Sequence, residues 1–170
     1  MAVMIHVSLV IPPIALFDAA RSQAILRREV GTAVSSIVED IAGEARQRTP
    51  VGVSGILRAS IDTRVTVGRD ASTLVMGEVF TGAQAPYAVF VEGGRAPGKF
   101  PPWGPGSSLA LWVQRIIGDV RLTFLIARAI ARRGIRGRHM FRDALEQVRP
   151  TIEPRIAAAV VRISQALGGL

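Results

Sequence analysis

The sequence predicts an α+β fold, in which a small, mainly antiparallel sheet packs on a long N-terminal helix and C-terminal helices follow. Two kinds of periodicity support this prediction. In three short stretches of the first half, apolar residues alternate with other residues, as in strands with one buried face. Elsewhere they recur every three or four positions, which is typical of helices that bury one stripe. The chain has 170 residues, enough to bury one substantial core.

We expect a single domain over residues 1–170, with three regions along it. Residues 1–13 form an N-terminal strand or arm. Residues 14–105 hold the long helix, a hairpin and a Gly/Pro-rich loop, and residues 106–170 form a basic helical half.

The first strand is predicted from alternating apolar residues: Val3, Ile5, Val7, Leu9 and Ile11. A proline pair at 12–13 ends it. His6 falls on the less apolar face, where we expect a solvent-facing side chain rather than a metal ligand.

The long helix is predicted from about Ala15 to Arg48, and Pro50 ends it by pushing Thr49 out of the α region. Its buried stripe consists of Val30, Val34, Ile37, Val38, Ile41 and Ala45. After a glycine-containing loop, a strand is expected from Leu57 to Val67 and a second from Thr73 to Thr81, paired as an antiparallel hairpin.

The stretch YAVFVEGGRAPGKFPPW, residues 87–103, joins the two halves and carries a dense cluster of Gly and Pro. Tyr87 to Glu92 is expected to form a short helical turn that ends at Gly93 and Gly94. Arg95 to Pro105 is too rich in Gly and Pro for a regular element. We interpret the stretch as a structural joint that presents a surface.

Three helices are expected after this joint. Ser107 or Ser108 caps the first, and its buried stripe is Leu109, Trp112, Val113, Ile116 and Ile117. The second runs from about Asp119 to Arg133 with the stripe Leu122, Leu125, Ile126, Ala129 and Ile130. The third starts near Met140, and its core positions are Phe141, Ala144, Leu145 and Val148. Pro150 and Pro154 are expected to kink or split it. Trp112 is expected in the core, whereas Trp103 fills either its own domain or a partner's groove.

The charge is uneven along the chain. Residues 1–100 carry ten basic and nine acidic side chains, whereas residues 101–170 carry eleven arginines against four acids. Arginine favours fixed, forked contacts with carboxylate or phosphate. A codon bias of the genome would give the same excess of arginine over lysine.

Enzyme signatures are missing from the sequence. It has no cysteine, two widely separated histidines and no Walker A, GxSxG or HExxH pattern. We therefore expect no catalytic residues, no metal and no cofactor. The apolar N-terminus has no basic flank and is broken by prolines, so we expect no targeting or membrane segment, and a protein made and used in the cytosol or released inside an assembly.

Nucleic-acid binding is the main alternative to assembly with other proteins. Six arginines fall within fifteen residues with no intervening acid: Arg128, Arg132, Arg133, Arg136, Arg138 and Arg142. Such a density would neutralise several phosphates and make binding salt-dependent. No recognition-helix pattern accompanies it, and a basic surface that meets an acidic partner subunit explains the same residues.

Two stretches together resemble a known family. TPVGVSGILRASI, residues 49–61, and YAVFVEGG, residues 87–94, are similar to motifs of the HK97-type tail-component proteins of tailed bacteriophages, the neck or tail-completion family. The later stretches APGKFPPW, WVQRIIG and IARRGIRGRHMF look like a longer variant of that family. The resemblance spans roughly residues 30 to 145 in the family's order.

The resemblance implies a structural virion protein of the head-to-tail joining region, assembled in the host cytoplasm. Such proteins form a ring, commonly sixfold, around the DNA channel and join the connector, tail-terminator or tail-tube proteins. We expect the subunit or partner interface to include Arg58, Arg64, Glu92, Arg95, Lys99 and Trp103. The arginine-rich segment would face an acidic partner or, non-specifically, the DNA in the channel.

Overall fold

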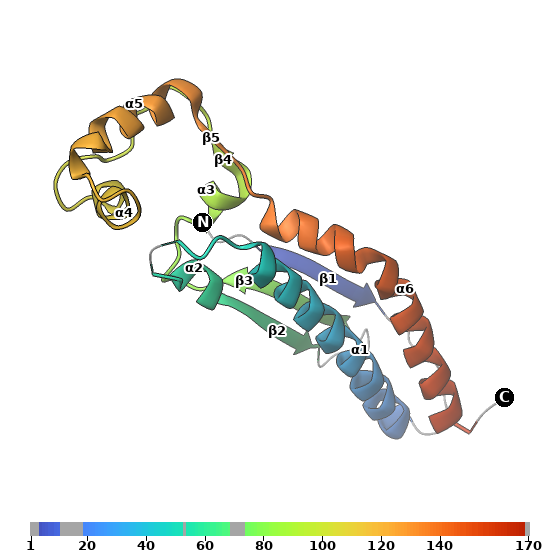
Figure 1. Cartoon of the computed structure of the whole chain (residues 1–170). Coiled ribbons are helices and arrows are strands. Elements are labelled where there is room, and N and C mark those ends of the chain that lie inside the picture. The colour runs from blue at the N-terminus through green and yellow to red at the C-terminus, as the bar shows by residue number, and fades with distance from the viewer. Residues whose placement is uncertain (1–3, 11–18, 53, 69–73, 169–170) are drawn as a thin grey trace.

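The protein has a body of sheet and long helices, and a smaller helical lobe projects from one end of it (Figure 1). The structure is a computed structural model that describes residues 4–10, 19–52, 54–68 and 74–168. We call residues 95–138 the basic lobe and the other described residues the body.

A three-stranded antiparallel sheet forms one layer of the body. Its strands are β1 (Met4–Val10), β2 (Ile61–Val67) and β3 (Leu74–Thr81), in the order β1-β3-β2. The N-terminal strand and the antiparallel hairpin predicted from the sequence are both confirmed. His6 pairs in register with Glu78. The side chain of His6 is outside what the structure describes, so the expectation that it faces solvent stays a prediction.

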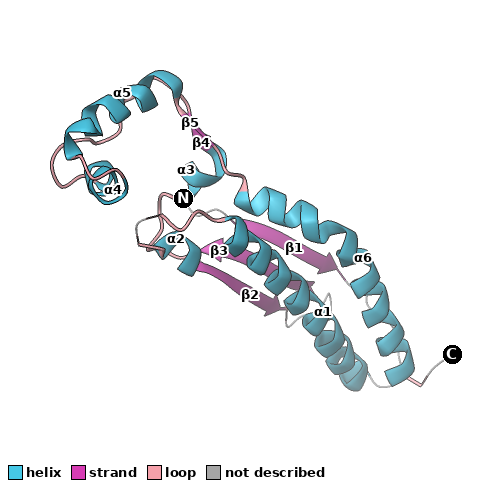
Figure 2. Ribbon diagram, in the orientation of Figure 1, coloured by secondary structure: helices cyan, strands magenta, loops and turns pink. Residues whose placement is uncertain are grey.

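Helix α1 (Ala19–Arg48) packs across β2 and β3 (Figure 2). All six residues of its predicted stripe are buried, and most of them are fully inaccessible. The fit is close because β3 carries Gly77 beneath the helix. A Cβ on Gly77 would lie 2.5 Å from Cγ1 of Val38 and 2.7 Å from Cγ1 of Val34. The expected α+β architecture, with a small sheet packed on a long N-terminal helix, is confirmed.

Helix α6 (Met140–Ala166) lies beside α1 and completes the core. Phe141, Ala144 and Val148 are buried as predicted, and they join a cluster that includes residues of α1 and β3. Pro150 and Pro154 lie inside α6 without splitting it, and the helix bends between its ends (Figure 1). Each proline removes one hydrogen bond of the helix, because it lacks an N–H donor. Of the two predicted outcomes, a kink or a split, the structure has the bend.

The strand expected from Leu57 is wrong at its start. Residues Ile56–Ala59 form one helical turn, α2, and the strand begins only at Ile61. Gly55 precedes the turn in the left-handed conformation, with φ of 68°. The backbone N–H of Ser60 closes the turn by donating to the carbonyl oxygens of Ile56 and Leu57. The short helix α3 (Ala88–Gly93) forms where a helical turn was predicted.

The close approach of α1 to β3 gives a first prediction. Gly77→Ala forces a methyl group against the stiff side chains of Val34 and Val38, and we expect it to lower the free energy of unfolding by about 1–3 kcal/mol. Gly43→Ala is the matched control in the middle of α1, where an added Cβ meets nothing within 4 Å. It should stabilise the helix by up to about 1 kcal/mol. Urea denaturation measures both; a Gly77→Ala variant as stable as the control would contradict this packing.

A second prediction concerns the pairing of α1 with α6. The Glu29 carboxylate accepts hydrogen bonds from Nε of Arg162 at 2.9 Å and Nε of Arg28 at 3.0 Å. These bonds, chiefly that of Arg162, hold the pKa of Glu29 below its ordinary value of 4.5. A carboxyl group whose pKa is lowered on folding stabilises the fold above its unfolded pKa, and loses this effect as the pH falls through its folded pKa.

Glu29→Gln should therefore be less stable than the wild type at neutral pH, and the difference should shrink as the pH falls below 4.5. Urea denaturation at a series of pH values measures this. Glu153→Gln, an exposed carboxylate of α6, is the control and should change stability little at any pH. A Glu29→Gln deficit that stays constant into acid solution would rule out the pair as its cause.

Candidate assembly surface: the neck and the basic lobe

A two-stranded ribbon, the neck, joins the lobe to the body. Strand β4 (Gly94–Arg95) pairs antiparallel with β5 (Ile135–Arg136). Three backbone hydrogen bonds continue the pairing on either side: Arg138 N to Val91 O at 2.8 Å, His139 N to Glu92 O at 3.1 Å and Gly98 N to Ala131 O at 2.8 Å. Residues about forty positions apart in the sequence are thereby held side by side.

Glycine makes this close pairing possible. A Cβ on Gly94 would collide with the carbonyl oxygen of Ile135, and one on Gly134 with that of Arg95. Both residues also have positive φ, 79° and 73°, where side chains are disfavoured. Backbone therefore packs directly on backbone at the neck.

Glu92 ties the neck to the start of α6. Its Oε2 accepts a hydrogen bond from the backbone N–H of Phe141 at 3.0 Å, and its Oε1 accepts one from that of Arg142 at 3.1 Å. His139, the residue before α6, is left-handed with φ of 49° and supplies no side-chain cap. Glu92 thus caps a helix that begins 48 residues later in the chain, and its carboxylate faces the positive end of the helix dipole.

The lobe is built from α4 (Ser108–Ile116), a 3₁₀ turn η1 (Val120–Leu122) and α5 (Thr123–Arg133). Ser107 caps α4, as predicted, by accepting a hydrogen bond from the N–H of Ala110. Asp119 caps η1 and also accepts two bonds from the guanidinium of Arg121, which lowers the pKa of Asp119.

The loop before α4 packs its aromatic rings on α5. The ring of Phe100 stacks on that of Phe124 with centroids 6.2 Å apart, and Trp103 meets Phe124 edge-on at 5.1 Å. Arg95 holds the loop by donating from Nη2 to the carbonyl oxygens of Lys99 and Phe100. Trp103 remains 45% exposed, so it contacts its own lobe and presents half its surface to solvent.

The interior of the lobe is small, and the apolar stripes predicted for its helices are confirmed only in part: Val113 is buried, whereas several other members are exposed. The buried residues are Ala110, Val113, Thr123, Ala127 and Ala131. Trp112 is 37% exposed and Leu125 is 55% exposed, although both were expected in the core. The helices pack on each other and on η1, and neither makes a substantial contact with the described helices and strands of the body. No further layer of the described residues covers their outer faces.

As a result, the lobe carries a large exposed apolar surface. Of eighteen large hydrophobic side chains exposed in the described residues, ten belong to the lobe. They are Phe100, Trp103, Leu111, Trp112, Ile116, Ile117, Val120, Phe124, Leu125 and Ile135. Apolar side chains exposed in this number are typical of surfaces that contact other molecules when they form one contiguous patch.

The arginine cluster predicted from the sequence divides across the neck. Arg128, Arg132 and Arg133 share the outer face of α5, where with Leu125 and Ala129 they line an open depression of about 610 Å³. Arg136 and Arg138 lie on and beside β5. Arg142 is separate, because it belongs to α6 and pairs with Asp143.

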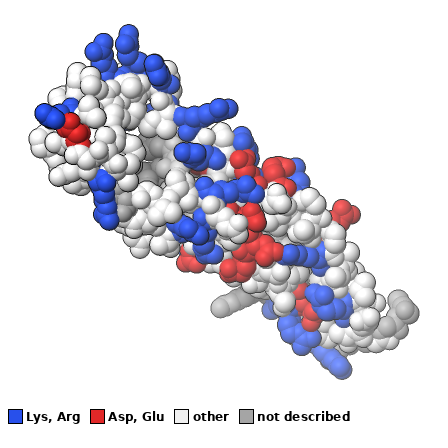
Figure 3. All heavy atoms as spheres, viewed as in Figure 1, with Lys and Arg blue, Asp and Glu red and all other residues white. Residues whose placement is uncertain are grey.

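The lobe holds the whole net charge of the protein. Residues 95–138 contain nine basic side chains and one acid, a net of +8, and the rest of the chain contains twelve of each. Figure 3 shows Lys and Arg spread over the lobe and Asp and Glu gathered across the middle of the body.

The remaining predicted interface residues are scattered. Arg58 is exposed on α2, whereas Arg64 lies on β2 with its Nη1 3.6 Å from Oε2 of Glu78 and its guanidinium 4.9 Å from the centre of the Phe80 ring. Arg95, Lys99 and Trp103 come together in the loop of the lobe. Glu92 is hydrogen-bonded to the start of α6 within the chain, and its contact with another subunit stays a prediction.

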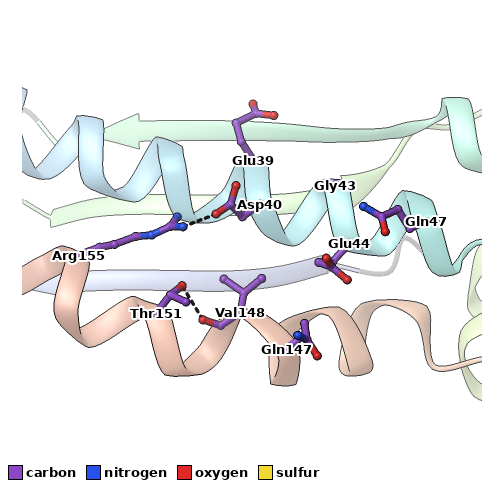
Figure 4. Close-up of a pocket in the computed structure, with 9 residues that line it drawn as sticks. All are labelled: Glu39, Asp40, Gly43, Glu44, Gln47, Gln147, Val148, Thr151 and Arg155. Atoms are coloured by element: carbon purple, nitrogen blue, oxygen red, sulfur yellow. Dashed lines mark hydrogen bonds and ion pairs between the residues drawn. The ribbon is translucent and has the colours of Figure 1, made fainter.

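Sequence reasoning missed a groove between α1 and α6. About 400 Å³ in volume, it is lined by Glu39, Asp40, Gly43, Glu44, Gln47, Gln147, Val148, Thr151 and Arg155. Arg155 reaches across from α6 to pair with Asp40 (Figure 4). The signal was present in the sequence, because Glu39, Asp40 and Glu44 fall on the polar faces of the long helix.

Within the described residues, no three or more His, Asp or Glu side chains gather as metal ligands. None of the described helices combines the length and apolar character that a membrane span requires.

The fold and these surfaces define a small α+β protein whose exposed features are suited to contacts with other macromolecules. Residues 17–94 match the family model described as Bacteriophage HK97-gp10, putative tail-component. The resemblance to that family is thereby confirmed over these residues, and it indicates a bacteriophage tail component. The match ends at Gly94, where the neck begins, so the later motifs remain a resemblance. No curated protein and no solved structure matches the chain.

The cap that Glu92 provides gives a third prediction. Glu92→Ala leaves two N–H groups at the start of α6 without their acceptor, and should destabilise the protein by about 1–2 kcal/mol. Glu92→Gln keeps one acceptor oxygen and should lose less. Chemical denaturation measures stability, and proteolysis within residues 95–138 reports loosening of the neck. Equal stability of Glu92→Ala and the wild type would show that the cap is not needed.

Proposed function

We propose that the protein is a structural component of the head–tail interface of a tailed-phage virion, a neck or tail-completion protein. In this proposal it forms an oligomeric ring, sixfold in symmetry, that joins the connector to the tail tube around the DNA channel. The observation that carries the proposal is the family match over residues 17–94, which covers α1, the hairpin and α3.

The lobe supports assembly as the mode of action. Its ten exposed hydrophobic side chains have no covering layer in the described chain, and such surface is stable in water when a partner buries it. Trp, Phe and Arg, all present there, are enriched at the centres of protein interfaces. Partners would be further copies of the chain and the neighbouring connector, tail-terminator or tail-tube proteins.

Interface positions within this proposal are Arg58, Arg64, Arg95, Lys99 and Trp103, which all expose part of their side chain. Glu92 belongs to the same proposal only indirectly, since it holds the neck that carries the lobe. The virion is the proposed location, and catalysis has no part in this function.

A second candidate is nucleic-acid binding through the arginine-rich segment 128–142. One observation favours it: Arg128, Arg132 and Arg133 form no ion pair with any described side chain and share one face. Channel DNA would be contacted through phosphates and without sequence preference.

Assembly gives a fourth prediction. Light scattering and negative-stain imaging should show a closed oligomer, either for the protein alone or after addition of tails or connectors purified from a particle that contains this protein. Arg136→Ala should weaken that assembly while leaving thermal stability unchanged, because the side chain is exposed on the neck. A strict monomer that binds neither tails nor connectors would refute the proposal.

Filter binding of duplex DNA across a salt series tests the second candidate. A steep fall of affinity with salt would support a phosphate-binding role, since each neutralised phosphate adds about 0.9 to the slope of the logarithmic plot. Flat or absent binding would remove it.

A further inference from the structure

The outer face of α5 carries an open depression of about 610 Å³, which we call the α5 depression. Its five lining residues, all exposed, are Leu125, Arg128, Ala129, Arg132 and Arg133. The first four occupy positions i, i+3, i+4 and i+7, so they share one side of the helix. Leucine and alanine side chains are thereby combined with three guanidinium groups on one surface.

The three arginines of the α5 depression are available to an acidic partner. Arg128, Arg132 and Arg133 form no ion pair with any described side chain. A guanidinium forms forked, charge-assisted hydrogen bonds with a carboxylate. Because Arg128 and Arg132 stand one turn apart, about 6 Å along the helix axis, they match two carboxylates at the same spacing on one face of another helix.

Leu125 distinguishes a protein partner from other acidic macromolecules. Its side chain is 55% exposed. The phosphates of a nucleic acid are charged and offer this side chain no apolar surface to pack on. An amphipathic helix that binds a bilayer buries a continuous apolar face, whereas arginines interrupt the apolar residues on this face of α5. A protein segment can supply carboxylates and an apolar side chain together, as at the centre of many interfaces.

The body of this chain does not supply the acidic counterpart. Of its twelve acidic residues outside the lobe, ten lie in the described part of the chain. Nine of these ten accept a hydrogen bond or form an ion pair within the chain. In the α1–α6 groove, the carboxylates of Glu39, Asp40 and Glu44 are all engaged in this way. The described surface of a second copy therefore offers no group of free carboxylates, which favours a different protein chain as the partner.

We propose that the α5 depression binds an acidic segment of a different protein chain. Two carboxylates of that segment, one helical turn apart, accept hydrogen bonds from Arg128 and Arg132, and an apolar side chain packs on Leu125. The net charge of +8 on the lobe steers the approach of the acidic segment. Copies of this chain then meet one another through other surfaces. This inference rests on the proposed function, because it names the chemistry of one partner in the assembly.

A designed peptide tests this chemistry on the whole protein. The peptide is a short helix with glutamates four positions apart and leucines on the same face, and a matched peptide carries serine in place of each leucine. Fluorescence anisotropy of the labelled peptides measures their affinity. The leucine peptide should bind at least about tenfold more tightly than the serine peptide, because its leucines bury apolar surface against Leu125.

Substitutions in the α5 depression separate its apolar part from its charge. Leu125→Ser should weaken binding of the leucine peptide about tenfold and leave any affinity for duplex DNA unchanged, because it removes apolar surface and no charge. Val161→Ser is the matched control, since Val161 on α6 is also 55% exposed, and it should alter neither affinity. Arg128→Gln with Arg132→Gln should weaken peptide binding further and reduce its dependence on salt. Circular dichroism should show all variants folded, since these side chains are exposed.

Two results would overturn the proposed contact. One is equal binding of the leucine and serine peptides, or binding by Leu125→Ser as tight as that of the wild type. The other is no binding of the leucine peptide, together with binding of duplex DNA or of phosphatidylglycerol vesicles that Arg128→Gln with Arg132→Gln removes. The α5 depression would then be a nucleic-acid or lipid surface.

The failure of this inference and that of the proposed function give different results. A closed oligomer in light scattering, without binding of the leucine peptide, refutes the acidic segment and leaves the ring standing. Peptide binding that depends on Leu125, in a protein that forms no oligomer and binds no tails or connectors, refutes the proposed function and leaves the chemistry of the α5 depression standing.

Discussion

The hydrogen bonds from the start of α6 to the Glu92 carboxylate are the interaction on which the arrangement of the two parts depends. They join the end of α3 to the beginning of α6, and everything between those points is the neck and lobe. A carboxylate suits this position because the first N–H groups of a helix lack internal partners and carry the positive end of its dipole. Both ends of the lobe are thus fixed at one place on the body, while α6 remains free to complete the core beside α1.

Sequence reasoning succeeded where one face of an element meets the core and failed where it does not. The stripe of α1 is strongly periodic and is buried in full, so its pattern alone defined the helix and its inner face. In α4 the same kind of pattern led to the wrong conclusion about Trp112, because periodicity shows which residues share a face and not whether anything covers it. The cap that Glu92 places on α6 could not be predicted from the sequence either. Capping motifs are recognised within a few residues of the helix start, whereas Glu92 lies 48 residues before it. The only hint was a carboxylate followed by two glycines.

The boundary of the family match and the boundary in the structure coincide. Residues up to Gly94 belong to the matched region, and the neck begins at that residue. Charge divides at nearly the same place: the lobe is strongly basic, and the rest of the chain carries equal numbers of basic and acidic residues. Because the lobe has its own small interior and shares little contact with the body, its outer faces can change in sequence without disturbing the core. The body therefore contains most of the buried core, and the lobe carries most of the exposed large hydrophobic side chains and the excess of basic residues.

The neck also has a mechanical consequence. At Gly94 and Gly134 the backbones of the two chain segments are in direct contact, with no side chain between them. Tension on the lobe would load the paired strands and the capped end of α6 together, and would pass along α6 to the ion pairs that Arg155 and Arg162 make with α1. A force on the lobe would therefore reach the two long helices of the body, α1 and α6, rather than its small sheet.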